Sequence, residues 1–587
     1  MQTIPRPEHP RPDFMRPDWL NLNGTWQFCF DDGNRGLAEK WFLPEKTLES
    51  SIVVPFCYES AQSGVHVQQH HDVMWYRRSF VLPESMAGKR ILLHFGAVDY
   101  SCTVYVNGVC AGEHEGGYTP FALDVTPFLS DGENDLCLRV EDRRDCTQPR
   151  GKQNWFDHWF GCWYTPTSGI WQTVYLEAAG DHYVISAHVT PDIDAGTASL
   201  RLTLDRAPET PLNASFQITY EGKPFRVQSQ QLTERSQRIV FDMVSGNLIQ
   251  GFSCWEPGHP ALYDLDIRLD GGDSVHTYFG MRKIEVRNGR VFLNNHPLYQ
   301  RLILDQGYWP DSLLTPPSDE AIRADIEWTQ KFGYNGARKH QKVEDPRYYY
   351  WADKMGLLVW GEIPSTYEFT QESVNNLSKT LAEFIRRDFN HPCIITWVPL
   401  NESWGVDRIF RDKRMQMASE MLYCQAKALD GTRLVSVNDG WEQTRTDIYG
   451  LHDYAAQGDI LASHFADPEA LENGSNDHHF CRADGYPRTK NEALLLTEYG
   501  GIAFQQDEEE EGAWGYHDKV HGIEEFFARY KSVTDAAREI PGCQGYCYTQ
   551  LTDVQQEVNG LLTPDRKPKI DPARFAALTV NPFGRYH

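Results

Sequence analysis

The chain has 587 residues, enough for about three or four domains of ordinary size. Hydrophobic residues make up 41% and charged residues 24%, as in a folded globular protein and unlike a disordered one. The formal net charge of −26 would repel phosphate backbones and anionic membrane surfaces, so we expect neither nucleic acid nor a membrane as a partner.

The start of the chain and its cysteines give expectations about its compartment. No basic segment followed by an apolar core opens the chain, and no apolar run is long enough to cross a bilayer. We therefore expect a cytoplasmic protein. The 13 cysteines are scattered and include no Cys-x-x-Cys pair, so we expect reduced thiols, no metal site and no cofactor.

Residues 1–180 are predicted to form a jelly-roll β-sandwich of the sugar-binding type. Short alternating stretches, such as 75–80 and 90–95, are separated by turn signals. Asn107-Gly108 predicts a type I′ hairpin, because both central residues of that turn need positive φ.

The pattern of apolar and polar residues changes twice further along the chain. Residues 181–285 still alternate, for example at 263–269, but are less aromatic, which favours an immunoglobulin-like β-sandwich. From 286 to 587 helical segments such as 319–332 alternate with short apolar strands, as is typical of a (β/α)8 TIM barrel. The eight strands of this barrel are predicted at 298–305, 334–340, 357–363, 393–400, 433–437, 447–454, 493–498 and 542–548. An acidic run at 507–511 is predicted to be a solvated loop.

Two glutamates stand directly at the ends of predicted barrel strands. Glu402 follows the fourth strand, and Glu498 ends the seventh. Functional groups of such barrels collect at the carboxyl ends of the strands. Hydrolysis of a glycosidic bond with retention needs two carboxyl groups about 5–5.5 Å apart, one as acid/base and one as nucleophile. The sequence therefore predicts a retaining glycosidase.

Short motifs are spread over nearly the whole chain. They are Leu-Asn-Gly-Thr-Trp at 22–26, Gly-Ile-Trp at 169–171, Trp-Glu-Pro-Gly-His-Pro at 255–260, Arg-Asp-Phe-Asn-His-Pro at 387–392, Thr-Glu-Tyr-Gly at 497–500 and Asp-Arg-Lys-Pro-Lys at 565–569. With these motifs the chain resembles glycoside hydrolase family 2, the group of β-galactosidases, β-glucuronidases and β-mannosidases. So many motifs in one order form a highly specific match.

The resemblance implies roles for the residues around the glutamates. Glu402 is implied to be the acid/base and Glu498 the nucleophile, while Asn401 is implied to bind the sugar 2-hydroxyl. Tyr454 matches an aromatic residue that touches the nucleophile, and Arg338 matches an arginine of the family. Because an acid must keep its proton near neutral pH, we expect burial and the second carboxylate to raise the pKa of Glu402.

Further substrate-binding residues are expected around this pair. They are His340, Asp305, Glu557 and Tyr548. The sugar platform is expected among Trp351, Trp360, Trp404 and Tyr548, whereas a structural role is favoured for His391.

One departure from the family motifs bears on the sugar. The β-glucuronidases of the family are expected to carry Asn-x-Lys shortly before Asp-Arg-Lys-Pro-Lys, but this chain has Glu557-Val558-Asn559. A glutamate facing a substrate carboxylate would weaken binding by like-charge repulsion, so hexuronides are disfavoured. Were a hexuronide the substrate, Arg338 or Lys339 would have to hold its carboxylate.

These observations favour a retaining exo-glycosidase acting on a neutral β-galactosidic or equivalent α-L-arabinosidic bond of a glycoside or oligosaccharide. The alternatives are a hexuronidase, acting on β-glucuronides or β-galacturonides, and an exo-galactofuranosidase or arabinofuranosidase. A non-catalytic alternative is a carbohydrate-binding scaffold that has lost activity. A homo-oligomer is compatible with the sequence.

Overall fold

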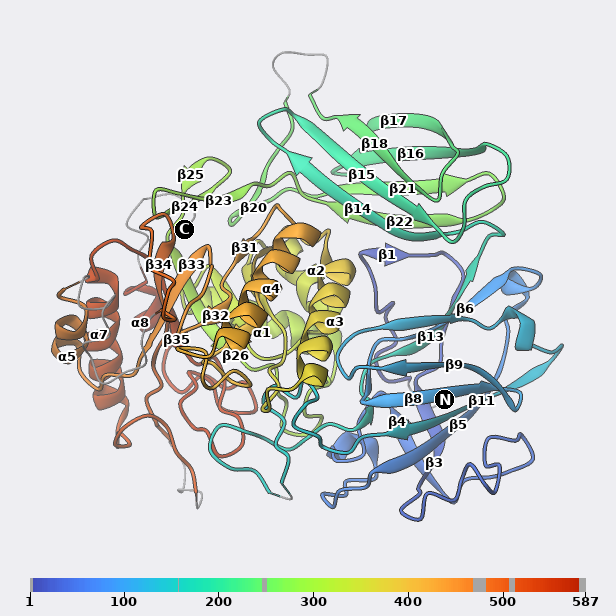
Figure 1. The fold of residues 1–587 in the computed structure, drawn as a ribbon, viewed down its shortest axis with the longest axis horizontal. Helices are drawn as coiled ribbons and strands as arrows, with labels where there is room; N and C mark the ends of the chain where they lie inside the picture. Colours follow the sequence, from blue (N-terminus) through green and yellow to red (C-terminus); the bar gives the residue numbers. More distant parts are fainter. Residues whose placement is uncertain (1–3, 157, 245–250, 468–481, 506–511, 580–587) are drawn as a thin grey trace.

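The computed structural model describes residues 4–156, 158–244, 251–467, 482–505 and 512–579. Figure 1 shows two β-sandwiches on the right and a barrel surrounded by helices on the left. Along the chain the two sandwiches come first and the barrel follows. This confirms the predicted fold class. Within the described residues, none of the helices combines the length and the apolar character needed to cross a membrane. The acidic run at 507–511 lies outside the described residues.

The first sandwich, at the lower right of Figure 1, consists of two antiparallel sheets. One has the order β10 (Phe121–Asp124), β6 (Arg90–Phe95), β13 (Val174–Ala179), β2 (Trp19–Asn21). The other has the order β4 (Ser50–Val54), β3 (Gly24–Phe30), β5 (Val73–Val81), β11 (Glu133–Glu141), β8 (Ser101–Val106), β9 (Val109–Glu115). Alternate residues of both sheets meet in a common apolar core. Asn107 and Gly108 join β8 to β9 with φ values of 51° and 77°, as the predicted hairpin turn requires.

The second sandwich lies above the first in Figure 1. Its larger sheet has the order β1 (Phe14–Met15), β22 (Ser274–Phe279), β21 (Tyr263–Leu269), β16 (Leu212–Tyr220), β17 (Lys223–Leu232). Its smaller sheet has the order β14 (Val184–Asp192), β15 (Thr197–Leu204), β18 (Ser236–Asp242). The edge strand β1 comes from the N-terminal segment, so the start of the chain ties the second sandwich to the first.

The barrel is built from one sheet of eight parallel strands, which are buried on both faces as expected for this architecture. The order is β31 (Leu434–Val435), β29 (Ile394–Val398), β28 (Leu358–Glu362), β27 (Gly336–Lys339), β26 (Gln300–Asp305), β35 (Cys543–Thr549), β34 (Ala493–Gly500), β33 (Ile448–Asp453). A hydrogen bond of 2.9 Å from Asp447 N to Val435 O links the two ends of this order, so the barrel is nearly closed. All eight predicted strands are present.

Helices cover the outside of the barrel and begin at local signals in the sequence. They are α1 (Asp319–Lys331), α2 (Pro346–Met355), α3 (Gln371–Asp388), α4 (Lys413–Leu429), α5 (Gly458–His464), α7 (Ile523–Glu539) and α8 (Pro572–Ala576). Asp345 caps α2 by accepting from Arg347 N, and Gly356 ends it with φ of 72°. Thr370 and Ser373 form a capping box at the start of α3. These side-chain caps give α2 and α3 defined starts after β27 and β28.

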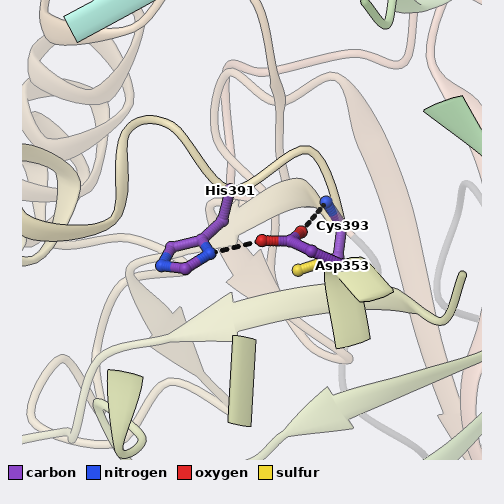
Figure 2. Close-up of side chains that lie close together, drawn as sticks. All are labelled: Asp353, His391 and Cys393. Carbon is purple, nitrogen blue, oxygen red and sulfur yellow. Dashed lines mark hydrogen bonds and ion pairs between the residues drawn. The ribbon is translucent and has the colours of Figure 1, made fainter. Parts of the chain in front are cut away.

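Figure 2 shows a buried cluster of Asp353, His391 and Cys393 in the barrel domain. His391 Nδ1 lies 2.5 Å from Asp353 Oδ2, and the backbone N–H of Cys393 donates to Asp353 Oδ1 at 2.8 Å. Tyr278 of β22 donates its hydroxyl to the same Asp353 Oδ2 at 2.8 Å. His391 and Cys393 precede β29, at the end of the barrel opposite the carboxyl ends of the strands. The ligand atoms of Asp353, His391 and Cys393 are spaced closely enough to hold a metal ion. Their hydrogen bonds instead connect the barrel to Tyr278 of the second sandwich, which agrees with a structural role for His391.

Candidate active site

The two glutamates come together at the carboxyl edge of the barrel. Glu498 lies within β34, and Glu402 follows the short strand β30 (Leu400–Asn401). One carboxylate oxygen of Glu402 and one of Glu498 lie within 4.8 Å of each other. This spacing is close to the separation of about 5–5.5 Å found in retaining glycosidases.

The backbone at Glu402 has an uncommon conformation. Glu402 has φ of 49° and Ser403 has φ of 57°, in the left-handed region that non-glycine residues rarely adopt. The Glu402 N–H donates to Asp439 O at 2.9 Å, and the Ser403 N–H donates to Asn438 Oδ1 at 2.9 Å. Both acceptors lie on β32 (Asn438–Asp439), so this strand holds the turn that presents the Glu402 carboxyl to the mouth.

Arg338, at the end of β27, links the carboxylates at the bottom of the site. It is fully buried and pairs with Glu362 at 2.8 Å, with Asp439 at 2.8 Å and with Glu498 at 3.2 Å. Burial lowers the pKa of Arg338, but the neighbouring carboxylates, Asp439 and Glu362 foremost, outweigh this and hold it well above its ordinary value. A permanent cation therefore faces one oxygen of Glu498.

The other oxygen of Glu498 and the neighbouring amide are also positioned. Tyr454 donates its hydroxyl to Glu498 Oε2, and its ring stacks on Tyr516 with centroids 3.4 Å apart. Asn401 Oδ1 accepts from Arg338 at 3.2 Å, whereas the buried Asn401 Nδ2 has no partner among the described residues. The structure thus holds Glu498 as an acceptor and leaves one amide donor of Asn401 unused beside it.

His452, at the end of β33, lies between the two glutamates. Its Nδ1 is 2.7 Å from Glu402 Oε1, and its Nε2 is 3.1 Å from Asp439 Oδ2 and 3.4 Å from Glu498 Oε1. Burial lowers the pKa of His452, but the three carboxylates, with Glu498 the largest contributor, raise it to about 10. His452 is therefore an imidazolium at neutral pH.

The pKa of Glu402 departs from the expectation drawn from the sequence. Burial raises it, but the hydrogen bond from His452, the charge of that imidazolium and the charge of Lys152 lower it by more, so it falls below its ordinary value. The expectation of a raised pKa was wrong for the free enzyme, because it included burial and the second carboxylate but not the intervening histidine. His452 therefore carries the proton of the hydrogen-bonded pair that it forms with Glu402.

A loop of the first sandwich closes one side of the mouth. This interdomain loop, residues 142–156 and 158–168, connects β11 to β12 (Gly169–Ile170). Trp163 donates its indole N–H to Tyr367 at 2.6 Å, and its ring centroid is 5.3 Å from that of Trp404, two residues beyond Glu402. Trp404 is the platform candidate that the structure places at the site, with Trp163 beside it.

Two of the other platform candidates lie elsewhere. Trp360 is fully buried in β28 and donates its indole N–H to Gln300, at the start of β26. Trp351 lies on α2, where its indole N–H donates to Asp319 of α1. Neither ring faces the glutamates.

Not every residue predicted at the site contacts the glutamates. Asp305 forms a buried pair of 2.8 Å with Lys339, which also pairs with Glu344 at 2.9 Å. His340 is buried with its Nδ1 2.9 Å from Glu362 Oε2, next to the Arg338 network. Asp305 therefore stabilises the base of the mouth.

Tyr548 does not lie at the mouth as predicted, whereas Glu557 does lie there but is bound by protein donors. Tyr548 is fully buried against Tyr530 of α7, with ring centroids 4.9 Å apart, so it packs between the barrel and a helix and does not reach the mouth. Glu557 does lie at the mouth, but it accepts from Tyr164 of the interdomain loop at 2.5 Å and from Asn559 at 3.0 Å.

Several residues of the site were not predicted. Glu362 and Asp439 come directly at or after the third and fifth barrel strands, so the strand-end rule that found the glutamates also covers them. Lys152 and Trp163 belong to the interdomain loop, and no barrel pattern points to them.

Comparisons with known proteins agree with this architecture. Family models described as "Glycosyl hydrolases family 2, sugar binding domain", "Glycosyl hydrolases family 2" and "Glycosyl hydrolases family 2, TIM barrel domain" match residues 20–177, 182–282 and 284–576, respectively. A β-galactosidase of Thermoanaerobacter pseudethanolicus is 29% identical over 401 residues, covering 65% of this chain and 52% of that relative. A β-glucuronidase of Paenibacillus borealis is 23% identical over 598 residues, covering 94% of each.

Solved structures show the same fold. A β-glucuronidase from an uncultured Clostridium species has a TM-score of 0.77 at 21% identity, covering 96% of this chain and 98% of that one. The Lactobacillus rhamnosus β-glucuronidase has a TM-score of 0.78 at 19% identity, covering 98% and 99%. With family models along nearly its whole length, the chain belongs to glycosyl hydrolase family 2 and is a hydrolase of O-glycosyl bonds.

Proposed function

We propose that this enzyme is a retaining exo-glycosidase in which Glu498 is the nucleophile and Glu402 the acid/base. The observation that carries the proposal is the pair of carboxylates within 4.8 Å at the ends of two barrel strands. The interdomain loop narrows the mouth on one side, which supports a pocket that accepts the end of a sugar chain.

The surroundings of each glutamate fit this division of roles. Arg338 and the Tyr454 hydroxyl stabilise Glu498 as an anion, the state in which it attacks the anomeric carbon. Glu402 passes a proton from His452 to the departing glycosidic oxygen while Glu498 attacks the anomeric carbon, so the glycosidic bond breaks and the glycosyl ester with Glu498 forms. Glu402 then takes a proton from a water molecule, which attacks the ester and releases the sugar with retained configuration. The unused amide donor of Asn401 supports its proposed hydrogen bond to the sugar 2-hydroxyl.

A β-hexuronide is the substrate class that we favour. The relative that matches 94% of the chain and the two solved structures above are named β-glucuronidases. This support outweighs the expectation of a neutral galactoside, which depended on Glu557 repelling a substrate carboxylate. Both oxygens of Glu557 accept hydrogen bonds from the protein donors Tyr164 and Asn559, so the carboxylate is engaged within the protein and neither oxygen is left without a donor.

A neutral β-galactoside is the second candidate. It is favoured by the named β-galactosidase at 29% identity and by Glu557-Val558-Asn559, in which an acid stands where an amide was expected and an amide where the cation was expected. A panel of nitrophenyl β-glucuronide, β-galacturonide, β-galactoside and α-L-arabinoside tests the two classes by their kcat/KM values. The hexuronide proposal fails if every neutral glycoside exceeds both uronides.

Replacement of the nucleophile tests the mechanism itself. Glu498→Ala should lower kcat by about 10⁴-fold or more, because no glycosyl ester can form. Added azide should restore turnover of an activated substrate and give the inverted glycosyl azide, detected by NMR. Retention of more than a few per cent of activity, or an azide product of unchanged configuration, would reject Glu498 as the nucleophile.

A further inference from the structure

Any carboxylate on the substrate would need a cation at the mouth, and the two expected cations are not free for it. Arg338 is surrounded by Glu362, Asp439 and Glu498. Lys339 pairs with Asp305 and Glu344. The expectation that one of these two would bind a substrate carboxylate is therefore not supported by their contacts.

A third cation, Lys152, reaches the mouth from the interdomain loop. The backbone of this loop is fixed on the barrel, because the N–H groups of Arg150 and Gly151 both donate to Ser365 O, at 2.9 and 3.1 Å. On the other side, Tyr164 N donates to Lys152 O at 2.8 Å, and the Tyr164 hydroxyl donates to Glu557. Lys152 is thus held between the segments that follow β28 and β35.

The Lys152 ammonium lies inside the site and has no carboxylate of its own. The residue is only 6% exposed, and its Nζ lies 4.8 Å from the ring centroid of Trp404. Lys152 forms no ion pair within the part of the chain that the structure describes. A buried ammonium without an anionic partner is unfavourable, so such a group usually marks the place of an anionic ligand.

The acids near Lys152 are each engaged by other donors. Glu557 accepts from Tyr164 and Asn559, Glu402 pairs with His452, and Glu498 pairs with Arg338 and Tyr454. They surround Lys152 with negative potential without binding it directly. Although burial lowers the pKa of Lys152, the groups around it, these three carboxylates included, raise it above its ordinary value, so the ammonium stays charged.

The thiol beside Lys152 does not replace an anionic partner. Burial raises the pKa of Cys162 to about 11, even though the Lys152 charge acts in the opposite direction. Cys162 is therefore a neutral thiol at physiological pH. The Lys152 ammonium therefore contacts the face of Trp404 and the Cys162 thiol, and its remaining N–H donors are available to a ligand at the mouth.

We propose that Lys152, supplied by the first sandwich, binds the carboxylate of a hexuronide substrate and so determines specificity for it. This inference rests on the proposed function, since it names the residue that would recognise that substrate class. It also assigns the first sandwich a direct part in substrate binding.

The test compares substrates that differ only in the charge of the uronic carboxyl. Nitrophenyl β-glucuronide and β-galacturonide are each paired with their methyl esters, and kcat/KM is measured for the wild type, Lys152→Met and Lys152→Arg. Lys152→Met should lower the acid-to-ester ratio of kcat/KM by about 30-fold to 10³-fold, as expected when one partner of a buried charge pair is removed. Lys152→Arg should keep most of the ratio, because it retains the charge.

A matched control separates this effect from damage to the fold. Lys379 on α3 donates to the backbone of Glu115 in the first sandwich and lies outside the site, so Lys379→Met should leave the acid-to-ester ratio unchanged. Equal losses for acid and ester in Lys152→Met, at an unchanged thermal midpoint, would overturn the inference and leave the hexuronide assignment standing. Turnover of galactosides without any turnover of uronides by the wild type would overturn both.

Discussion

At the scale of single residues, the proposed mechanism draws its proton from a histidine. His452 lies against three carboxylates that raise its pKa to about 10, while its hydrogen bond to Glu402 keeps that acid's pKa low. Formation of the glycosyl ester removes the charge of Glu498, the largest of the contributions that keep His452 protonated. The proton therefore becomes easier to release as the reaction proceeds.

Removing the acid should affect substrates unequally. Glu402→Ala should slow the release of poor leaving groups by roughly 10²–10⁴-fold, because their oxygen needs a proton in the transition state. Dinitrophenyl glycosides, whose leaving group departs as a stable anion, should lose far less in the first step. Equal losses of kcat/KM across a series of aryl glycosides of graded leaving-group pKa would reject Glu402 as the acid.

Removing the histidine should change the pH dependence. In the wild type, the Glu402–His452 pair keeps one proton until the pH approaches about 10. In His452→Asn the proton must stay on a carboxyl group alone, so the basic limb of kcat/KM for a poor leaving group should move to lower pH by about one unit or more. A basic limb at the same pH in both proteins would contradict the proton-store interpretation.

The same residues show which features of the site could be predicted from the sequence and which could not. Glu402 and Glu498 could be predicted because each directly ends a strand, and strand ends meet at the mouth. The pKa of Glu402 could not, because it depends on His452 being 2.7 Å away, a distance set by how two barrel strands are staggered. Tyr548 was misplaced for a related reason: a side chain near the end of a strand can point either into the mouth or toward the helices.

At the scale of elements, the site depends on one loop from another domain. Gly151 has φ of 59°, and a Cβ on it would lie 2.2 Å from Gln341 O, just after β27. Only glycine allows the interdomain loop to approach the barrel this closely. Local alternation predicted several strands of the two sandwiches, and short apolar runs between helical segments predicted the eight barrel strands. This docking contact joins segments far apart in the chain, so no such local pattern predicts it.

Displacing this loop should impair catalysis more than folding. Gly151→Ala should push the loop away from Gln341, move Lys152 and Trp163 from the mouth, and lower kcat/KM by roughly 10²-fold, as small misplacements of positioning groups do. Gly88→Ala is the control: it has a similar φ of 71° in the same sandwich, but its Cβ would meet nothing within 4 Å. Equal losses of kcat/KM in the two variants would show that the position of the interdomain loop does not limit catalysis.

At the scale of the whole molecule, a buried charge network joins both sandwiches and the N-terminal segment. Glu177 of β13 pairs with Arg16 at 3.1 Å and with His94 of β6 at 3.1 Å, and Arg16 also pairs with Asp273 of the second sandwich at 2.9 Å. His9 lies 3.3 Å from Glu177. Arg16 follows β1 directly, so the strand that the N-terminal segment adds to the second sandwich is locked to the first by this network.

Breaking this network should loosen the arrangement of the domains without changing the chemistry of the site. Glu177→Gln leaves the buried Arg16 without one of its two carboxylates, which should destabilise the folded chain by about 3–5 kcal/mol.

Burial raises the pKa of Glu177, but His9, His94 and Arg16 hold it well below its ordinary value. A depressed folded pKa contributes stability above the unfolded value of about 4.3 and loses it as the pH falls through the folded value. The thermal midpoints of wild type and Glu177→Gln should therefore differ most near pH 7 and converge below about pH 4, measured by scanning fluorimetry. A difference that stays constant from pH 7 to pH 3 would show that Glu177 acts through packing and not through its charge.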